Sequence, residues 1–422
     1  MRTNRFDTLP EARICCQTPR GGFLAVLGLF TIAAHGQTLL RGPDGGSPTV
    51  IGTDLAVLEA QEVRKDLPCE VSPTKPVLGF DLKFHAGYEI SVPLRELAGN
   101  DNLLTVLLRV TPVETPNSPT YLIQKTKVPS LPEDAKGDAY LQGTFDLGEG
   151  NYRVDWLMRD RSERVCAHFW DAEAGLAAKD KQVNVNLHSG EVAATEVEQF
   201  ADEPPVQRNV SDAPLNVKVL INFAPQNSHA ATLQPLDTSA LVSILRCIAR
   251  DPRITRFSLV AFNLKEQKIL YRQEAADRID FPAIGDALRG LQLGKVDFTR
   301  LNQKGADTEF LADLLVKEVG TTSADRPDAV IFAGPKAMLE ENLSVDTLRK
   351  VGEPEYPIFY MNYNLFPQAT PWRDSISVAV KHFKGQEFTI SRPRDVWFAV
   401  TEMMSKIVRF KSARRATTAA LD

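Results

Sequence analysis

A buried strand that ends in small polar residues is the first place where this chain could do chemistry. The stretch VLINFAPQNS, residues 219–228, turns from apolar residues to Asn222, Gln226, Asn227 and Ser228. In open α/β sheets, ligands bind beyond the carboxyl ends of the strands. A divalent cation there would need carboxylates, and this stretch has none. We therefore predict a polar rim that offers hydrogen bonds to a partner; the alternative is that these side chains only cap the turn.

Catalytic motifs are scarce in the rest of the sequence. LDTSA, residues 236–240, resembles the Asp-Thr-Gly/Ser turn of aspartic proteases, but it opens a predicted helix in which Asp237 or Thr238 would be the N-cap. The chain has neither a Gly-x-Ser-x-Gly elbow nor a glycine-rich phosphate loop. The histidines after residue 36 lack the close spacing of a zinc site: His85, His168, His188, His229 and His382. We therefore predict that the protein is not an enzyme.

The first 36 residues have the features of a secretory signal peptide. Four arginines precede the apolar run GGFLAVLGLFTIAA, and Ala34 and Gly36 have the spacing that signal peptidase requires before Gln37. The run is too short to span a membrane comfortably. We expect a signal peptide at residues 1–36 and a secreted or periplasmic protein with no stable membrane anchor after cleavage. An uncleaved anchor is the alternative.

Three cysteines follow the leader, and an odd number leaves at least one unpaired. Cys69 and Cys166 both lie in predicted β structure, where an oxidising compartment allows a disulfide between them. Two separate thiols are the alternative. Cys247 lies on the apolar face of a predicted helix, so we expect a buried thiol there.

Short alternating segments separated by Gly, Pro, Asn and Asp fill residues 60–188, which predicts an all-β sandwich. Within it, the phrase FDLGEGNYRVDW resembles the tyrosine corner of immunoglobulin-like and fibronectin-like sandwiches. The resemblance implies that Tyr152 hydrogen-bonds back across the turn that contains Gly148. Trp156 and Trp170 are then expected in the core; a role in stacking against a ligand is the alternative.

Two segments have the composition of mobile chain. Residues 189–213 are acidic, contain Pro204 and Pro205 and lack apolar periodicity, which predicts a solvated linker. An acidic interaction motif is the alternative. Residues 412–422 are basic without apolar periodicity, which predicts a disordered tail. Such a linker would let the two flanking domains move independently.

Residues 214–411 change to strands that alternate with helices. The apolar runs NVKVLINF, DAVIFAGP and YPIFYMNYN predict buried parallel strands, and RFSLVAFNLKEQKILYRQ predicts a hairpin. Amphipathic segments between them predict helices. This order predicts a doubly wound, mostly parallel six-stranded sheet with one antiparallel edge. The whole chain is therefore expected to be multidomain, with an all-β sandwich followed by an α/β domain.

The order of elements over roughly residues 213–411 resembles the von Willebrand factor A domain, also called the integrin I domain. The hairpin SLVAFNLKEQKILYRQ after the first helix is the most telling part. Many members of that family hold Mg²⁺ through an Asp-x-Ser-x-Ser motif, a Thr from a later loop and an Asp after the fourth strand.

This chain departs from the metal motif at most of its positions. The Asp-x-Ser-x-Ser positions fall on Asn222, Ala224 and Gln226, and the last Asp falls on Gly334; only Thr308 keeps its residue type. One carboxylate and a divalent ion attract by roughly 8 kcal/mol at 4 Å and an effective dielectric near 20. Because both carboxylates are missing, we predict a metal-free, degenerate site without a cofactor. Asp307, next to Thr308, is the one carboxylate that could restore metal binding at this site.

The function that these observations predict is protein binding. The formal charge is −5, and about −7 without the leader and its four arginines and two acidic residues. No segment after the leader combines a strong basic patch with aromatic residues, so nucleic acid is not an expected partner. We predict a non-catalytic secreted or envelope module for adhesion or scaffolding. The predicted rim for its unidentified protein partner comprises Asn222, Gln226, Asn227, Ser228, Asp307 and Thr308. An enzyme with an unrecognised site at the carboxyl edge of the sheet is the alternative.

Overall fold

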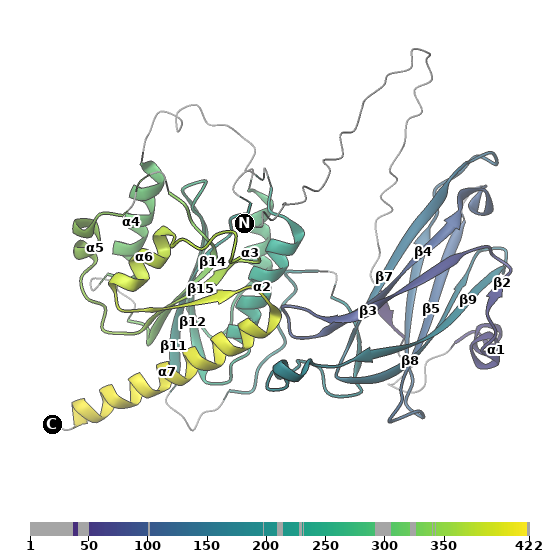
Figure 1. Cartoon of the computed structure of the whole chain (residues 1–422), viewed down its shortest axis with the longest axis horizontal. Coiled ribbons are helices and arrows are strands. Elements are labelled where there is room, and N and C mark those ends of the chain that lie inside the picture. Colours follow the sequence, from purple (N-terminus) through teal and green to yellow (C-terminus); the bar gives the residue numbers. More distant parts are fainter. Residues whose placement is uncertain are drawn as a thin grey trace, which may run out of the picture. The chain divides into compact units, whose positions relative to one another are not determined.

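The computed structural model shows an N-terminal part built from strands and a C-terminal part of helices around a sheet (Figure 1). The structure describes residues 37–40, 50–99, 102–196, 198–208, 214–227, 230, 232–291, 305–320, 326–339, 341 and 343–419. The predicted signal peptide, Ser228 and His229 lie outside these residues. No helix in the described ranges has the length and apolar character needed to cross a membrane.

Two antiparallel sheets make up the N-terminal part. The first has the order β1 (Thr38–Leu39), β6 (Thr120–Lys127), β5 (Leu103–Pro112), β8 (Gly150–Arg159), β9 (Val165–Ala174) and β2 (Arg64–Lys65). The second has the order β10 (Val192–Ala194), β7 (Asp138–Leu147), β4 (Phe84–Pro93) and β3 (Glu70–Leu78). Among the described residues, short helices accompany the sheets: α1 (Gly52–Ala60), η2 (Leu94–Leu97) and η3 (Ala178–Asp180).

Both antiparallel sheets contribute to one apolar core. Alternation along the strands turns every second side chain inward, so Tyr88 of β4 and Trp156 of β8 meet with ring centroids 5.7 Å apart. Trp156 is fully buried, and Trp170 packs partly buried against the same cluster. The core positions predicted for these two tryptophans are therefore confirmed.

The N-terminal part begins earlier than residue 60, where we placed the start of the sandwich. Strand β1 pairs with β6, and Leu58 of α1 is buried with Leu107 and Leu157 on the other face of the first sheet. The segments LLTVLLRV and VDWLM are apolar on both faces, because α1 covers the side that would otherwise meet water.

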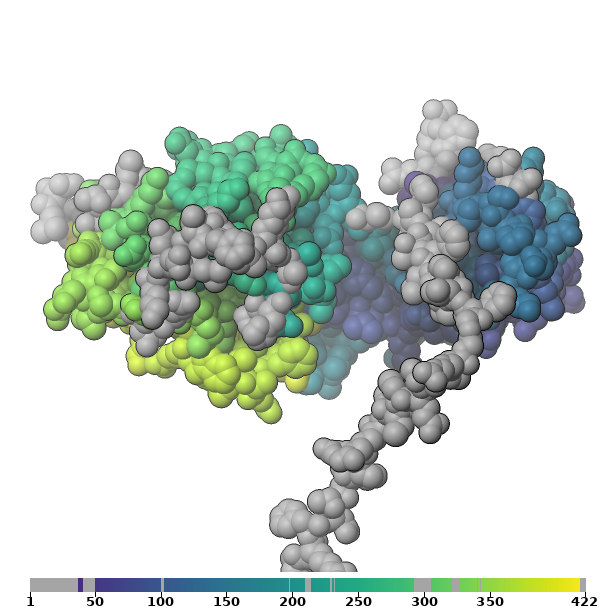
Figure 2. All heavy atoms as spheres, turned by 90° about the horizontal axis from the view of Figure 1, so that it is seen from above, coloured from purple at the N-terminus to yellow at the C-terminus, as the bar shows by residue number. Residues whose placement is uncertain are grey.

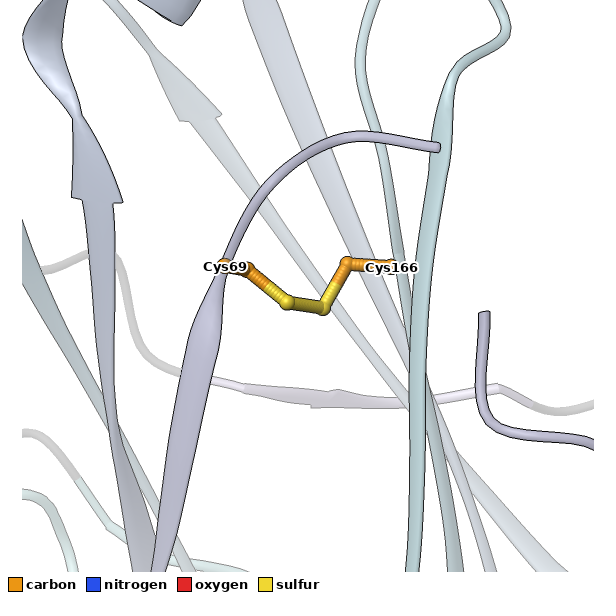
Figure 3. Close-up of a disulfide and its surroundings, with 2 residues drawn as sticks. All are labelled: Cys69 and Cys166. Carbon is orange, nitrogen blue, oxygen red and sulfur yellow. A yellow bond between two sulfur atoms is a disulfide. The ribbon is translucent and has the colours of Figure 1, made fainter. Parts of the chain in front are cut away.

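A disulfide connects the two antiparallel sheets. It joins Cys69, directly before β3, to Cys166 in β9, with Cα atoms 6.3 Å apart (Figure 3). Cys166 is buried in the shared core, and Cys69 packs against it. Cys247 is the free cysteine among the described residues, and burial raises the pKa of its thiol to about 12.

The tyrosine corner predicted from FDLGEGNYRVDW is confirmed. The hydroxyl of Tyr152 donates a 2.8 Å hydrogen bond to the carbonyl oxygen of Gly148, and it lies 3.3 Å from the carbonyl oxygen of Glu191. A Cβ atom at Gly148 would lie 1.8 Å from the carbonyl oxygen of His188, so only glycine fits there. The hydroxyl thus ties β8 to the turn before it.

Replacing Tyr152 by Phe should lower the free energy of unfolding by about 1–2 kcal/mol, because buried carbonyl oxygens lose their donor while the ring stays in place. Urea unfolding followed by tryptophan fluorescence measures the change. Tyr140→Phe is the matched control, since Tyr140 is 73% exposed on β7 and should give no change. Equal stability of Tyr152→Phe and the wild type would contradict this role.

The prediction of a solvated linker over residues 189–213 is wrong for its described residues. Residues Val192–Ala194 form β10, which pairs with β7 and extends the second sheet. Glu203 is an ion-pair partner of both Arg246 and Arg250, at 3.0 and 2.8 Å. The acidic composition alone suggested that the segment is solvated. In the structure, the carboxylate of Glu203 instead pairs with two arginines of the helix that follows.

Phe200 fastens the same segment to the C-terminal part. Its ring and Cβ lie over Gly285, where an added Cβ would come within 2.8 Å of Phe200. The backbone carbonyls of Gln199 and Ala201 accept hydrogen bonds from Arg246, at 3.2 and 3.1 Å. The described residues Val192–Glu203 are therefore bound to the rest of the protein, which does not support the expectation of a free spacer.

The C-terminal part contains one six-stranded mixed sheet. Its order is β13 (Lys268–Ala276), β12 (Ile254–Asn263), β11 (Leu215–Asn222), β14 (Ala329–Pro335), β15 (Ile358–Tyr363) and β16 (Gln386–Ile390). Every neighbouring pair is parallel except β12 and β13, the predicted hairpin. The order of elements predicted from residues 214–411 is therefore present.

Helices cover both faces of this sheet. Odd-numbered residues of β11, such as Val219, face the core of α2 (Pro235–Ala249), α3 (Phe281–Arg289) and α7 (Pro393–Ala419). Leu220 faces the opposite core, formed with α4 (Ala306–Glu318), α5 (Val345–Val351) and α6 (Ser375–His382). Because both faces are buried, β11 is an almost continuous apolar run.

The predicted disordered tail at residues 412–422 is wrong for most of its length. Helix α7 continues to Ala419, and its last turns are exposed at the surface of the C-terminal part (Figure 2). Alanine and arginine in this segment favour helix, and the ammonium of Lys411 lies 2.6 Å from the carboxylate of Asp328. The missing apolar periodicity reflects exposure, not disorder.

Candidate binding site at the carboxyl edge of the C-terminal sheet

The carboxyl ends of β11, β14 and β15 meet at one edge of the sheet, because these strands are parallel. The loops that follow them surround a cavity of about 420 Å³. The residues around it are Asn222, Ala224, Pro225, Gln226, Leu264, Lys265, Gln267, Ala306, Asp307, Lys336, Ala337, Met338, Leu339, Thr370 and Trp372. This cavity lies where the sequence placed a binding rim.

Asn222 does not offer its side chain to a partner, which corrects its place in the predicted rim. It is 1% exposed, and its Oδ1 accepts a 3.1 Å hydrogen bond from the backbone amide of Leu264. Asn263, at the end of β12, donates from Nδ2 to the carbonyl oxygen of Phe223 at 2.6 Å. The two asparagines thus hold the ends of β11 and β12 together, which is the capping alternative.

Gln226 and Asn227 lie further along the same loop. Gln226 borders the cavity, and its buried Nε2 has no hydrogen-bond partner among the described residues. Its backbone amide donates to Oδ2 of Asp237 at 3.3 Å. Asn227 is exposed, and its carbonyl oxygen accepts from the amide of Ala230. Gln226 is therefore the member of this loop whose side-chain donor is available at the cavity.

Asp237 is not the N-cap of α2, contrary to the sequence-based expectation. The helix starts at Pro235 with Gln234 as N-cap, so Asp237 falls in the first turn. Its buried carboxylate accepts the Gln226 amide and so fixes the loop to the helix. Burial raises the pKa of Asp237.

Asp307 and Thr308 start helix α4 on the other side of the cavity. Oδ1 of Asp307 accepts the amide of Thr308 at 2.7 Å, and the hydroxyl of Thr308 donates to the carbonyl oxygen of Glu341 at 2.8 Å. Asp307 borders the cavity, whereas Thr308 is not among the residues around it. Only Asp307 of this pair is placed to meet a ligand.

Gly334, the position that the metal motif assigns to an aspartate, has no room for a side chain. Its φ is +149°, and an added Cβ would lie 2.8 Å from Cβ and 2.9 Å from the carbonyl oxygen of Asn222. Close packing of β14 on β11 therefore fills the space that a second carboxylate would need. The chain therefore departs from the metal motif in the packing of its backbone as well as in its side chains.

Three residues at this edge were missed by sequence reasoning: Lys336, Met338 and Trp372. The ammonium of Lys336 donates to the carbonyl oxygens of Thr370 and Trp372, so it joins the loops after β14 and β15. Nε1 of Trp372 lies 3.0 Å from the sulfur of Met338. Apolar residues in the post-strand loops AGPKAM and NLFPQATPW were the available signal.

Asp374 anchors the base of both loops. It is buried, and its Oδ2 accepts the amide of Ala337 at 2.7 Å and the hydroxyl of Tyr360 at 3.1 Å. Oδ1 accepts the amide of Ser377 at 2.9 Å and caps α6. Burial raises the pKa of Asp374 despite these donors. The loops that carry Met338 and Trp372 are therefore held at a fixed point.

The described residues around the cavity combine apolar and amide side chains with a few charged groups. They include one carboxylate, Asp307, and two ammonium groups, Lys265 and Lys336, but neither histidine nor cysteine. Apolar and amide surface on fixed loops suits contact with another molecule.

Comparisons with known proteins add little to this picture. No protein-family model and no curated relative matches the sequence. The structural-genomics target SoR45 is 13% identical, with 28% of this chain and 93% of that chain covered and a TM-score of 0.17. A beta-glucosidase from Listeria innocua in complex with glucose is 12% identical, with 26% and 16% covered and a TM-score of 0.15. A glycosyl hydrolase family 2 member from Bacteroides cellulosilyticus DSM 14838 is 9% identical, with 79% and 49% covered and a TM-score of 0.18. TM-scores this low carry no argument.

Proposed function

We propose that this protein is a non-catalytic secreted or envelope protein whose C-terminal part is a metal-free von Willebrand factor A-like binding module. The strand order with one antiparallel hairpin supports the family assignment. The tyrosine corner supports an immunoglobulin-like assignment for the N-terminal part. The disulfide between Cys69 and Cys166 supports an oxidising compartment, in agreement with the predicted signal peptide.

The observation that carries the proposal is the pair of exposed apolar side chains beside the cavity. Met338 and Trp372 are 61% and 48% exposed, and Phe366, in the loop after β15, is 69% exposed. Protein interfaces are enriched in aromatic residues and methionine, and tryptophan is the commonest type at their energetic centres. Large apolar side chains gathered at one loop edge of a sheet support a protein-binding surface.

The fixed loops give such a surface its specificity. Lys336 joins the two loops that carry Met338 and Trp372, and Asp374 holds both at their base. A surface that is already ordered loses little conformational entropy on binding. The proposed role is therefore adhesion or scaffolding through the carboxyl edge, with Trp372 at its centre.

Replacing Trp372 by Ala should weaken binding of the partner by about 2 kcal/mol, or roughly 30-fold in Kd. The partner would bury the exposed face of Trp372, and alanine removes this apolar contact. The intact secreted protein, immobilised, first identifies the partner from culture supernatant or envelope extract. Titration of the purified partner against each variant then gives Kd. Phe410→Ala is the matched control, because Phe410 is 42% exposed on α7 and is not among the residues around the cavity.

Removal of metal ions separates this proposal from a metal-dependent mode of binding. Because Gly334 leaves no space for a carboxylate, EDTA should leave Kd for the partner unchanged. Loss of binding in EDTA, or equal affinities of Trp372→Ala and wild type, would refute a metal-free site at this edge.

A further inference from the structure

A histidine, an aspartate four residues before it and a distant aspartate come together in the N-terminal part. Asp81 lies in the turn between β3 and β4, His85 in β4 and Asp146 in β7. Nε2 of His85 is 3.0 Å from Oδ1 of Asp81, and Nδ1 is 2.9 Å from Oδ1 of Asp146. One ligand atom from each of the three residues lies within 4.8 Å of the others.

The two aspartates differ in how they are held. Asp146 is 1% exposed, and its carboxylate accepts a 2.6 Å hydrogen bond from the hydroxyl of Thr195 and lies 3.5 Å from the ammonium of Lys83. Asp81 accepts only a 3.3 Å hydrogen bond from the backbone amide of Lys83 besides its contact with His85. Its side chain is 21% exposed and that of His85 is 35% exposed. Asp146 is thus fixed and buried, whereas the side chains of Asp81 and His85 are partly exposed.

Gly79 keeps the space around these two partly exposed side chains open. An added Cβ at this position would lie 2.3 Å from Nε2 of His85 and 2.6 Å from Oδ1 of Asp81. No side chain at residue 79 is compatible with the present geometry, so the backbone itself leaves the imidazole and the carboxylate facing each other.

This arrangement is the one that proteins use around a metal-binding histidine. Such a histidine usually donates its other ring N–H to a carboxylate, which sets the tautomer and orients the ring. Nδ1–H donates to the fixed Asp146, and Nε2–H donates to Asp81 in the metal-free protein. A metal ion bound between Nε2 and Asp81 would replace the proton on Nε2. Once that proton is gone, Lys83 is the ammonium beside the two carboxylates, and the metal ion supplies the positive charge that the proton gave up.

We propose that Asp81 and His85 bind a divalent transition-metal ion, with Asp146 as the residue that positions the imidazole. The ligand atoms are Nε2 of His85 and the carboxylate of Asp81, and water completes the coordination. A nitrogen ligand favours Zn²⁺ over Mg²⁺, which prefers oxygen ligands alone. This site lies in the N-terminal part and is independent of the proposed protein-binding edge.

Isothermal titration of the intact mature protein with ZnCl₂, and separately with MgCl₂, tests the proposal. A Cys247→Ala background removes the free thiol as a competing zinc ligand. We expect one saturable Zn²⁺ site per chain and no saturable Mg²⁺ binding. His85→Gln and Asp81→Asn should each weaken Zn²⁺ binding at least tenfold, and Asp146→Asn should weaken it by about 10- to 100-fold, as loss of an orienting partner does.

His188→Gln is the matched control. His188 also contacts a carboxylate, with Nδ1 3.0 Å from Oε2 of Glu191, but it is 97% exposed and lies outside the cluster. Its variant should bind Zn²⁺ as the background protein does. Undiminished binding by His85→Gln, or an equal loss in His188→Gln, overturns the assignment.

NMR of the protein with its site residues unchanged tests the proposal even if a variant does not fold. In ¹⁵N-labelled protein, Zn²⁺ should shift the Nε2 resonance of His85 and leave Nδ1 protonated toward Asp146. A shift at Nδ1 instead, or none at either ring nitrogen, overturns the proposed ligand. Neither result bears on partner binding by Trp372, so the two proposals fail separately.

Discussion

Replacing Cys69 and Cys166 together by alanine should lower the free energy of unfolding of the N-terminal part by about 4 kcal/mol. The bridge closes a loop with a sequence separation of 97 residues, and loops of this length restrict the unfolded chain most. Its position between the two sheets adds to the effect, since Cys166 lies in their common core. Guanidinium unfolding monitored by tryptophan fluorescence in a Trp372→Phe/Trp397→Phe background, which leaves the tryptophans of the N-terminal part, measures the difference.

Cys247→Ala is the matched control for this experiment. Cys247 forms no bridge and belongs to α2, so its replacement should leave the transition of the N-terminal part in place. Reduction of the wild type should reproduce the double variant. If the double variant and the oxidised wild type unfold at the same denaturant concentration, the bridge does not stabilise the fold.

Replacing Glu318 by Leu should lower the free energy of unfolding of the C-terminal part by about 3–5 kcal/mol, because it removes the carboxylate that faces a buried ammonium. Lys218 of β11 is 4% exposed, and its Nζ lies 3.5 Å from Oε2 of Glu318, itself 2% exposed. Arg272 contacts the other oxygen of Glu318 at 2.6 Å. Arg272 is 34% exposed and can turn to water, whereas Lys218 is enclosed by the sheet and α4.

The double variant Lys218→Met/Glu318→Leu distinguishes charge burial from lost packing. Removing both buried charges should restore most of the stability that Glu318→Leu loses, since an apolar pair of similar volume needs no compensation. Thermal unfolding of the wild type, Glu318→Leu, Lys218→Met and the double variant gives the coupling between the two sites. If the double variant is less stable than Glu318→Leu, the buried ammonium of Lys218 is not the cause of the stability that Glu318→Leu loses.

Most of the fold follows from patterns within the sequence. Strands such as β5 and β8 alternate, β11 and β14 are short apolar runs, and the helices between them have the expected period. These signals are local, so one sequence is enough to read them. The tyrosine corner also comes from adjacent residues, and its hydrogen bond from Tyr152 to Gly148 is present.

Features that depend on distant partners were not predictable in the same way. The acidic segment before β11 looked solvated because its arginine partners, Arg246 and Arg250, lie more than 40 residues away in sequence. Asn222 looked like a rim residue because its acceptor role depends on the amide of Leu264 in another loop. In each case the sequence shows the residue itself but does not show which distant residue contacts it in the fold.

The candidate sites show the same limit more strongly. Trp372 and Met338 become a surface only because two loops meet at one edge of the sheet. His85 had no ligand spacing in sequence, since one of its two carboxylate neighbours, Asp146, is on a different strand. Chemistry that is assembled from separate strands leaves little trace in residue spacing.

The contacts of Phe200 and Glu203 determine where the chain can be cut to produce a C-terminal fragment. A fragment that starts at residue 206 would leave Gly285 uncovered and Arg250 without its carboxylate partner. The same residues should shield the segment from proteases that would cut an open spacer. A C-terminal fragment made for biochemistry therefore has to begin upstream of Glu196, whose carboxylate also pairs with Arg246.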